Sequence, residues 1–249
     1  MDRSVSGFPR NATSSVSSTL PIPESRALTP LTPAFFECDA LTLAQRLLGK
    51  VLRRRWQEKW LAARIIETEA YTLQDRGSHA SLGYTHARRA LFMGGGTIYM
   101  YYARGGDSLN IGAVGEGNAV LIKSAYPWED EHSDGESIAA MQALNPDARG
   151  LPRPLHTLCA GQTLLCRALA LKVPDWNARS FDPQTFFVED VGIDVPRIIC
   201  TTRLGIPPGR DEALPYRYVD AALARYCTRN PLRRGQLAGE HYTWVEGVG

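Results

Sequence analysis

Short runs in which apolar and polar residues alternate, separated by turns that contain glycine, predict a protein built mainly from β-strands. The longest run covers residues 61–71. Strict alternation would place five of its side chains on one face: Ala63, Ile65, Glu67, Glu69 and Tyr71. That face begins apolar and ends with two carboxylates and a phenol, where a core should continue. Such a break in the pattern is typical of a functional site, although an ion pair at a sheet edge would also produce it.

Turn residues and periodicity divide the rest of the chain into short elements. Further strands are expected at residues 50–56, 97–102, 109–111, 119–123, 186–191 and 197–203. Helices are expected after Asp39, whose side chain can cap a helix, and at residues 137–144 and 158–169. Arg104 and the glycines that follow it predict a tight hairpin turn.

Composition suggests one large domain with a tail at each end. The chain has 249 residues, of which 44% are hydrophobic, and this is enough to form a sizeable core. Residues 1–33 are rich in Ser, Thr and Pro and show no periodicity, so we expect a disordered tail. We assign residues 34–240 to the domain and residues 241–249 to a short C-terminal tail.

Charge and cysteine content exclude few functions. The formal net charge of +2 does not by itself indicate nucleic-acid binding, but most of the positive charge is arginine, which suits phosphate contacts. The five cysteines are scattered and form no C-x-x-C pair, which argues against a zinc site or a disulfide framework. No apolar run approaches the roughly 18 residues that a membrane helix needs.

Several runs together resemble a known family. They are Ile66–Tyr71 (IETEAY), Ser78-His79, Thr97–Tyr101 (TIYMY), Leu109-Asn110, Val120–Lys123 (VLIK), and the stretch from Leu158 to Leu169, with looser matches at Arg203–Ile206 and Asn230-Pro231. In this order they resemble the alkyladenine (3-methyladenine) DNA glycosylase family. The Glu-Thr-Glu-Ala-Tyr run with the downstream Ser-His is the most specific part of the match.

The resemblance implies roles for individual residues. Glu69 would position and deprotonate the attacking water, and Lys123 would lie beside that water. Three rings would stack on a base that has been flipped out of the duplex: Tyr71, His79 and Tyr101. Asn110, at the floor of the pocket, would disfavour the exocyclic amino group of undamaged guanine.

The DNA-facing hairpin departs from the family. Relatives usually place a tyrosine before a glycine as the wedge that enters the duplex, whereas this chain has Arg104 before Gly105. An arginine can fill the gap left by a flipped base, but less like an apolar wedge. Contacts to the DNA backbone are assigned, on weaker grounds, to Arg88, Arg89 and Arg229.

Purely structural roles, or different catalytic roles, remain open for several of these residues. We interpret Glu67 as a structural ion-pair partner and Tyr99 as a core residue. The Lys123 amine could attack the sugar and give lyase activity, although the resemblance favours water. Two rival functions are a non-catalytic protein that binds damaged DNA and a metal-dependent hydrolase. The hydrolase would use Glu67, Glu69 and His79, but the chain has no second well-spaced histidine.

The sequence therefore predicts a single α+β domain with a curved antiparallel sheet, flanking helices and a protruding hairpin. The resemblance implies a monofunctional DNA glycosylase, without lyase activity, that acts on alkylated or deaminated purines. The expected partner is duplex DNA containing damaged bases. We expect no cofactor, no metal, no membrane contact and a monomeric state, in the cytoplasm or nucleoid of a bacterium or the nucleus of a eukaryote.

Overall fold

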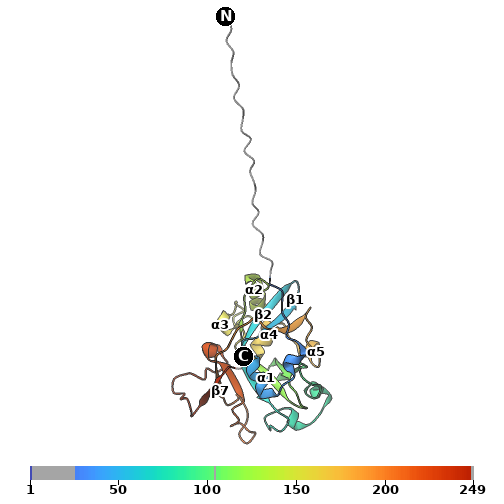
Figure 1. Ribbon diagram of the computed structural model, residues 1–249, viewed down its shortest axis with the longest axis vertical. Coiled ribbons are helices and arrows are strands. Elements are labelled where there is room, and N and C mark those ends of the chain that lie inside the picture. Colours follow the sequence, from blue (N-terminus) through green and yellow to red (C-terminus); the bar gives the residue numbers. More distant parts are fainter. Residues whose placement is uncertain (2–25, 104, 248–249) are drawn as a thin grey trace.

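A nine-stranded antiparallel sheet forms the centre of the part of the chain that the computed structural model describes, namely residues 1, 26–103 and 105–247. Its strands are β1 (Val51–Trp56), β2 (Lys59–Tyr71), β3 (Ile98–Ala103), β4 (Gly106–Gly112), β5 (Ala119–Pro127), β6 (Phe186–Glu189), β7 (Arg197–Thr201), β8 (Arg217–Asp220) and β9 (Tyr242–Glu246). The sheet does not close into a barrel, and helices lie around it (Figure 1). The predicted α+β class is confirmed.

The helices are short. The α-helices are α1 (Ala40–Arg46), α2 (Gly135–Leu144), α3 (Leu155–Leu158), α4 (Gln162–Ala168) and α5 (Val173–Trp176). The 3-10 helices are η1 (Pro33–Phe36), η2 (Ala80–Leu82), η3 (His86–Phe92) and η4 (Ala221–Tyr226). The single helix predicted at 158–169 is instead two, because Gly161 has a φ of +114° and interrupts the helical backbone.

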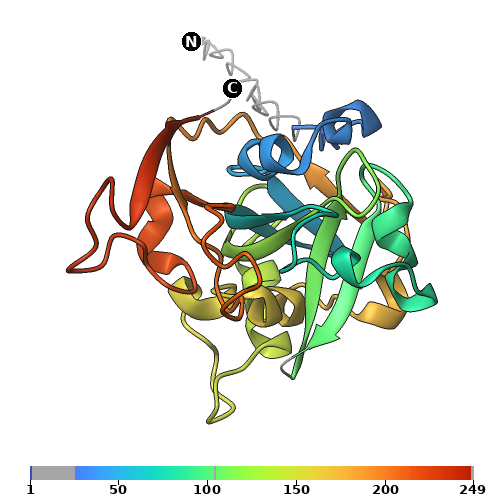
Figure 2. The ribbon, with the colours of Figure 1, turned by 90° about the horizontal axis from the view of Figure 1, so that it is seen from below.

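Strand β2 organises the sheet because it pairs with three other strands. It pairs with β5 on one side, and with β1 and then β8 on the other. The main path runs β3-β4-β5-β2-β8-β7-β9. Figure 2 shows the consequence: the red strand β9 lies on the opposite side of the molecule from the green β3–β4 hairpin.

The strict alternation of side chains between the two faces, predicted for β2, is wrong at the middle of the strand. The pairing of β2 with β5 is irregular between Ile65 and Thr68, where Ile66 and Lys123 are left out of the register. Residues on both sides of the irregularity, Ile65 and Ala70, belong to the main hydrophobic core, and the Thr68 hydroxyl donates to the Ala44 carbonyl of α1. The apolar face therefore continues through Thr68 and Ala70, and the carboxylates lie on the other face.

The main core lies between the sheet and α1, α2 and α4. Asp39 caps α1 as predicted, because its side chain accepts hydrogen bonds from the backbone N–H groups of Leu41 and Thr42. The fully buried Leu43 and Leu47 of this segment pack against the core side of the sheet. This core holds in place the strands whose opposite face carries the polar residues.

The described parts of the two segments assigned to tails contact the sheet. β9 lies within the segment assigned to a C-terminal tail and pairs with β7 over five residues, from Tyr242 to Glu246. Most of the predicted N-terminal tail, residues 2–25, lies outside the described residues. Of its remainder, the Arg26 side chain forms an ion pair with Glu189, and Pro30 bridges to the same residue. No helix in the described part of the chain is long and apolar enough to cross a membrane.

Candidate active site

A row of four residues crosses the sheet on the face away from the main core. Tyr99 of β3 pairs with Asn110 of β4, Asn110 pairs with Leu121 of β5, and Leu121 pairs with Glu69 of β2. Residues directly opposite one another in neighbouring strands point to the same face. The register therefore brings together residues that are up to 52 positions apart in the sequence.

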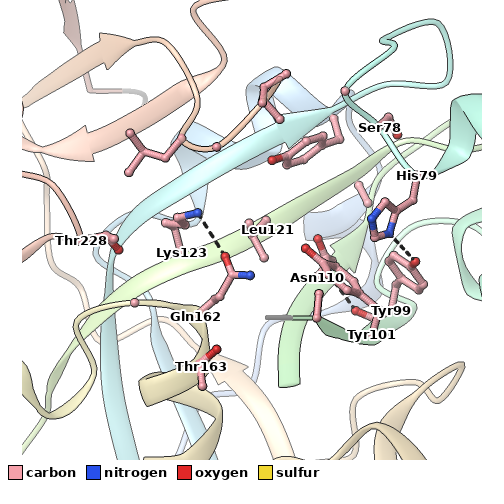
Figure 3. A pocket seen from close by; sticks show the side chains of 18 of the residues that line it. Ser78, His79, Tyr99, Tyr101, Asn110, Leu121, Lys123, Gln162, Thr163 and Thr228 are labelled. Carbon is pink, nitrogen blue, oxygen red and sulfur yellow. Dashed lines mark hydrogen bonds between the residues drawn. The ribbon is translucent and has the colours of Figure 1, made fainter. Parts of the chain in front are cut away.

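A cavity of about 550 Å³ opens over this row. The residues that line it include Tyr71, Ser78, His79, Tyr99, Tyr101, Asn110, Leu121, Lys123, Gln162, Thr163, Leu204, Arg210 and Thr228. Figure 3 shows the rings of His79, Tyr99 and Tyr101 gathered near Asn110, with Lys123 and Gln162 facing each other across from them. A volume of this size is typical of small-molecule sites and leaves ample room for a nucleobase.

Glu69 lies beneath the cavity wall, with no exposed surface. Its carboxylate accepts hydrogen bonds from the Tyr71 hydroxyl at 2.7 Å and from the Leu204 backbone N–H at 3.0 Å. The Lys123 ammonium lies 3.5 Å from the same carboxylate. A buried carboxylate needs such partners, since an isolated charge in an apolar environment is strongly disfavoured. Tyr71 and Lys123, which do line the cavity, connect it to Glu69.

Lys123 is held in place by a residue that the sequence analysis did not assign. Its ammonium donates to the Gln162 side-chain oxygen at 3.1 Å. The amide nitrogen of Gln162 in turn donates to the Ser108 hydroxyl at 2.8 Å. Gln162 is the first residue of α4, so the start of this helix orients the lysine toward the carboxylate.

Three aromatic side chains form the other wall. The His79 and Tyr101 rings are in contact, with centroids 4.4 Å apart and an interplanar angle of 64°. His79 Nδ1 lies 2.9 Å from the hydroxyl of Tyr99, which lines the cavity although it was assigned to the core. Because His79 and Tyr101 touch, a planar ligand cannot lie between these two rings and has to stack on their cavity side.

Burial and charge set the protonation of two of these groups. Burial, with the positive charges of Arg88 and Arg210, lowers the pKa of His79, so the imidazole is neutral at pH 7. Burial and the charge of Glu69 raise the pKa of Tyr71 well above its ordinary value. The Tyr71 hydroxyl therefore keeps its proton and donates a hydrogen bond to the carboxylate.

Asn110 lies at the floor of the cavity and is nearly fully buried. Its amide nitrogen donates to the Tyr99 carbonyl at 3.2 Å, across the strand pair. This bond fixes the plane of the side chain, so a ligand at the floor meets a rigid amide.

The β3–β4 hairpin approaches α4 closely. Gly106 pairs with Ala103 at the base of the turn, and a Cβ atom added to Gly106 would lie only 2.5 Å from the Thr163 hydroxyl oxygen. At the turn itself Gly105 has a φ of +79°, which favours glycine. Arg104, proposed as the wedge, lies outside the described residues.

The arginines assigned to backbone contacts differ in their surroundings. Arg88 donates to the Thr85 hydroxyl and to the His79 carbonyl, and Arg89 donates to the His86 carbonyl. Arg229 is exposed, and its carbonyl accepts a hydrogen bond from Arg217. The structure thus places Arg88 beside the aromatic wall and leaves the Arg229 side chain open to solvent.

Glu67 does not line the cavity, although one of its partners, Thr228, does. Its carboxylate forms a buried ion pair with Arg217 at 2.6 Å and accepts from the Ser124 hydroxyl and the Thr228 N–H. Within the described residues no group of three or more His, Cys, Asp and Glu side chains is arranged to hold a metal ion. The partners of Glu67 fit the structural role that the sequence analysis gave it.

Sequence reasoning missed Gln162, Leu204 and Arg203 as parts of this site. Gln162 follows Gly161 at the point where helical periodicity restarts, which was the available signal. Leu204 acts through its backbone N–H, which no side-chain pattern can indicate. Arg203 lies behind Tyr71, with its guanidinium carbon 4.5 Å from the ring centroid.

Comparisons with known proteins identify the family of the chain. The model of the family Methylpurine-DNA glycosylase (MPG) matches residues 34–223. A Pseudomonas aeruginosa protein named "Putative 3-methyladenine DNA glycosylase" is 63% identical over 224 residues, which cover 90% of this chain and 92% of its own. Proteins with the same name are 66% identical over 212 residues in Pseudomonas savastanoi pv. phaseolicola (85% and 95% of the two chains) and 34% identical over 191 residues in Methanocella arvoryzae (75% and 90%). The chain therefore belongs to the methylpurine-DNA glycosylase family.

Proposed function

We propose that this protein is a monofunctional DNA glycosylase that excises alkylated and deaminated purines from duplex DNA, including 3-methyladenine, 7-methylguanine, hypoxanthine and ethenoadenine. It flips the damaged nucleotide into the cavity and hydrolyses the N-glycosidic bond with a water activated by Glu69. This reaction starts base excision repair. The protein acts as a monomer, in the cytoplasm or nucleoid of a bacterium.

One observation carries the proposal: a fully buried carboxylate lies directly behind an aromatic cavity of about 550 Å³. Tyr71 and Lys123 both contact Glu69 and line the cavity, so its charge acts on whatever occupies that space. Cleavage of the glycosidic bond gives the sugar oxocarbenium character, which a nearby carboxylate stabilises. The same group can take a proton from water, which typically contributes about 10²- to 10⁴-fold in rate.

The aromatic wall supports base flipping. Extruding a nucleotide from the stack costs a few kcal/mol, and stacking on aromatic rings returns about 1 to 3 kcal/mol per base. Alkylated purines such as 7-methylguanine carry a positive charge and gain further attraction from the rings of Tyr71 and Tyr101. A neutral His79 adds a ring without adding a repelling charge.

Asn110 supplies selectivity in this proposal. A purine stacked on the aromatic wall places its edge against the cavity floor, where the Asn110 amide is fixed by its bond to the Tyr99 carbonyl. The exocyclic amino group of undamaged guanine would collide with this side chain, which its bond to the Tyr99 carbonyl keeps from turning aside. Purines that lack that amino group avoid the conflict. 7-Methylguanine keeps the amino group, and in this proposal it is still excised because its positive charge already makes it a good leaving group.

The surroundings of Lys123 support water rather than an amine as the nucleophile. Its ammonium donates to the Gln162 side-chain oxygen at 3.1 Å and lies 3.5 Å from the Glu69 carboxylate, so these two partners already engage the amine and it is not free to attack a sugar. Borohydride reduction during turnover should therefore trap no protein–DNA adduct. A covalent adduct would overturn the monofunctional assignment.

The decisive experiment is Glu69→Gln, assayed by single-turnover release of bases from methylated duplex DNA. Glutamine keeps the shape and can still accept from the Leu204 N–H, but it cannot serve as a base. We expect release to fall by about 10²- to 10⁴-fold while damaged-DNA binding persists. Release at the parental rate would refute the assignment of the base.

Glu67→Gln is the matched control, since it makes the same change two residues away on the same strand. Its carboxylate pairs with Arg217, so we expect lower stability but release per folded molecule close to that of the parent. Circular dichroism gives the folded fraction of both variants. A wild-type protein that binds damaged duplex tightly but releases no base would instead indicate a non-catalytic damage-binding protein.

A further inference from the structure

A positive charge lies directly behind the Tyr71 ring. The Arg203 guanidinium carbon is 4.5 Å from the centroid of that ring and 5.5 Å from the centroid of Tyr216. Arg203 is only 4% exposed and does not line the cavity, whereas Tyr71 does. The Tyr71 ring therefore separates the guanidinium from the space that a base would occupy.

The Asp75 carboxylate pairs directly with this guanidinium, and the charge of Glu69 also acts on it. Both oxygens of Asp75 accept hydrogen bonds from Arg203, one of them at 2.9 Å, and Asp75 is 3% exposed. Asp75 also accepts from the Gly77 N–H at 2.7 Å, in the loop that leads to His79. Arg203 donates further to the Ala70 carbonyl. The pair is thus fixed in orientation by the loop and by the end of β2.

This arrangement has an electrostatic consequence for a charged ligand. A base stacked on the cavity side of Tyr71 lies one ring thickness beyond the guanidinium, in surroundings that screen charge poorly. Without Asp75, Arg203 would repel a cationic base through the ring but would leave a neutral base almost unaffected. With Asp75 ionised, the two charges largely cancel at that distance.

We propose that Asp75 is a specificity-determining residue that lets the cavity accept cationic purines by neutralising Arg203 behind Tyr71. The proposal rests on the proposed glycosylase function. Asp75, which lies outside the cavity, would select substrates by their charge, whereas the residues that line the cavity would select them by their shape.

The test is Asp75→Asn, which removes the charge but keeps an oxygen that can accept from Arg203 and from the Gly77 N–H. Single-turnover release is measured for duplexes that differ only in carrying 7-methylguanine, which is cationic, or hypoxanthine, which is neutral. We expect the ratio of the two rate constants to shift against 7-methylguanine by on the order of tenfold, for an effective dielectric constant near 20. An unchanged ratio, including one in which both rates fall equally, would overturn the proposal and leave Asp75 a structural role.

The double variant Asp75→Asn, Arg203→Met separates charge from damage to the loop. It removes both charges, so the ratio should return toward the parental value even if both rates remain lower. A ratio that stays shifted in the double variant would refute the electrostatic explanation.

Failure of the proposed function gives a different result. If the wild type releases neither base, the glycosylase assignment fails, and the same comparison is made by fluorescence anisotropy of the two labelled duplexes. Asp75→Asn should then weaken binding of the 7-methylguanine duplex relative to the hypoxanthine duplex. Equal weakening of both would overturn the inference.

Discussion

Replacing Gln162 by leucine removes the acceptor that holds the Lys123 ammonium while leaving the volume of the side chain nearly unchanged. The substitution breaks two bonds, one of 3.1 Å from Lys123 and one of 2.8 Å to the Ser108 hydroxyl. Lys123 then has one charged neighbour at the cavity, the Glu69 carboxylate 3.5 Å away. We expect the ammonium to move toward Glu69, form a closer ion pair and compete with water for the carboxylate.

The magnitude follows from the kind of bond that is lost. A hydrogen bond to a charged group contributes about 1.5 to 3 kcal/mol. If about 1.4 kcal/mol of this is lost from the transition state, base release slows about tenfold. Ser108 has no exposed surface and loses its partner, so the melting temperature should fall too, by about 2 to 4 °C per kcal/mol for a chain of this size.

The assay is single-turnover release of 7-methylguanine with enzyme in excess, at a temperature where circular dichroism shows the variant to be folded. Gln162→Glu restores an acceptor for Lys123 and should be impaired less than the leucine variant. Gln142→Leu is a remote control, because the Gln142 amide only donates to the Arg153 carbonyl. Parental release by Gln162→Leu would show that Gln162 does not position Lys123.

Two further predictions concern the hairpin and the first helix. Gly106→Ala places a methyl group 2.8 Å from Thr163 Cβ and should destabilise the fold by about 1 to 3 kcal/mol, measured by thermal unfolding. Gly135→Ala is the control, because no atom lies within 4 Å of its added methyl group, and its stability should not fall. An unshifted melting temperature for Gly106→Ala would contradict this packing. The Thr42 hydroxyl and two backbone N–H groups lower the pKa of Asp39, so its contribution is present above the unfolded-state pKa and is lost as the pH falls through the folded-state pKa. Asp39→Ala should therefore lower stability by about 1 kcal/mol at pH 7 and by less at pH 3, and a pH-independent difference would argue against the cap.

Periodicity predicted most of the strands and helices but not the point where the pairing of β2 with β5 becomes irregular. β1 and β3 begin within one residue of the predicted starts at 50 and 97, because a glycine, Gly49 or Gly96, ends the segment before each strand. The irregularity at Ile66 leaves no trace in composition, since it depends on how β5 pairs with β2. β9 was missed because both its faces are largely open to solvent, and its residues show no buried stripe.

The sequence likewise identified some residues of the candidate site and not others. Tyr71, His79, Tyr101, Asn110 and Lys123 were assigned by resemblance, and the structure gathers them around one cavity. The supporting groups were not found, because their roles come from backbone atoms or from second contacts, as with the Leu204 N–H on Glu69. A sequence pattern identifies residues that bear chemistry more readily than the residues that orient them.

The irregular pairing between β2 and β5 ties the lengths of the two strands together. Ile66 and Lys123 each stand outside the register, and the pairing resumes beyond them as it was before, with Thr68 opposite Ile122. Losing or gaining one residue in either strand alone would turn Glu69 or Leu121 toward the core. Insertions and deletions in this region can therefore survive only as matched pairs, so relatives that differ in length should differ in loops and leave this stretch of both strands at constant length.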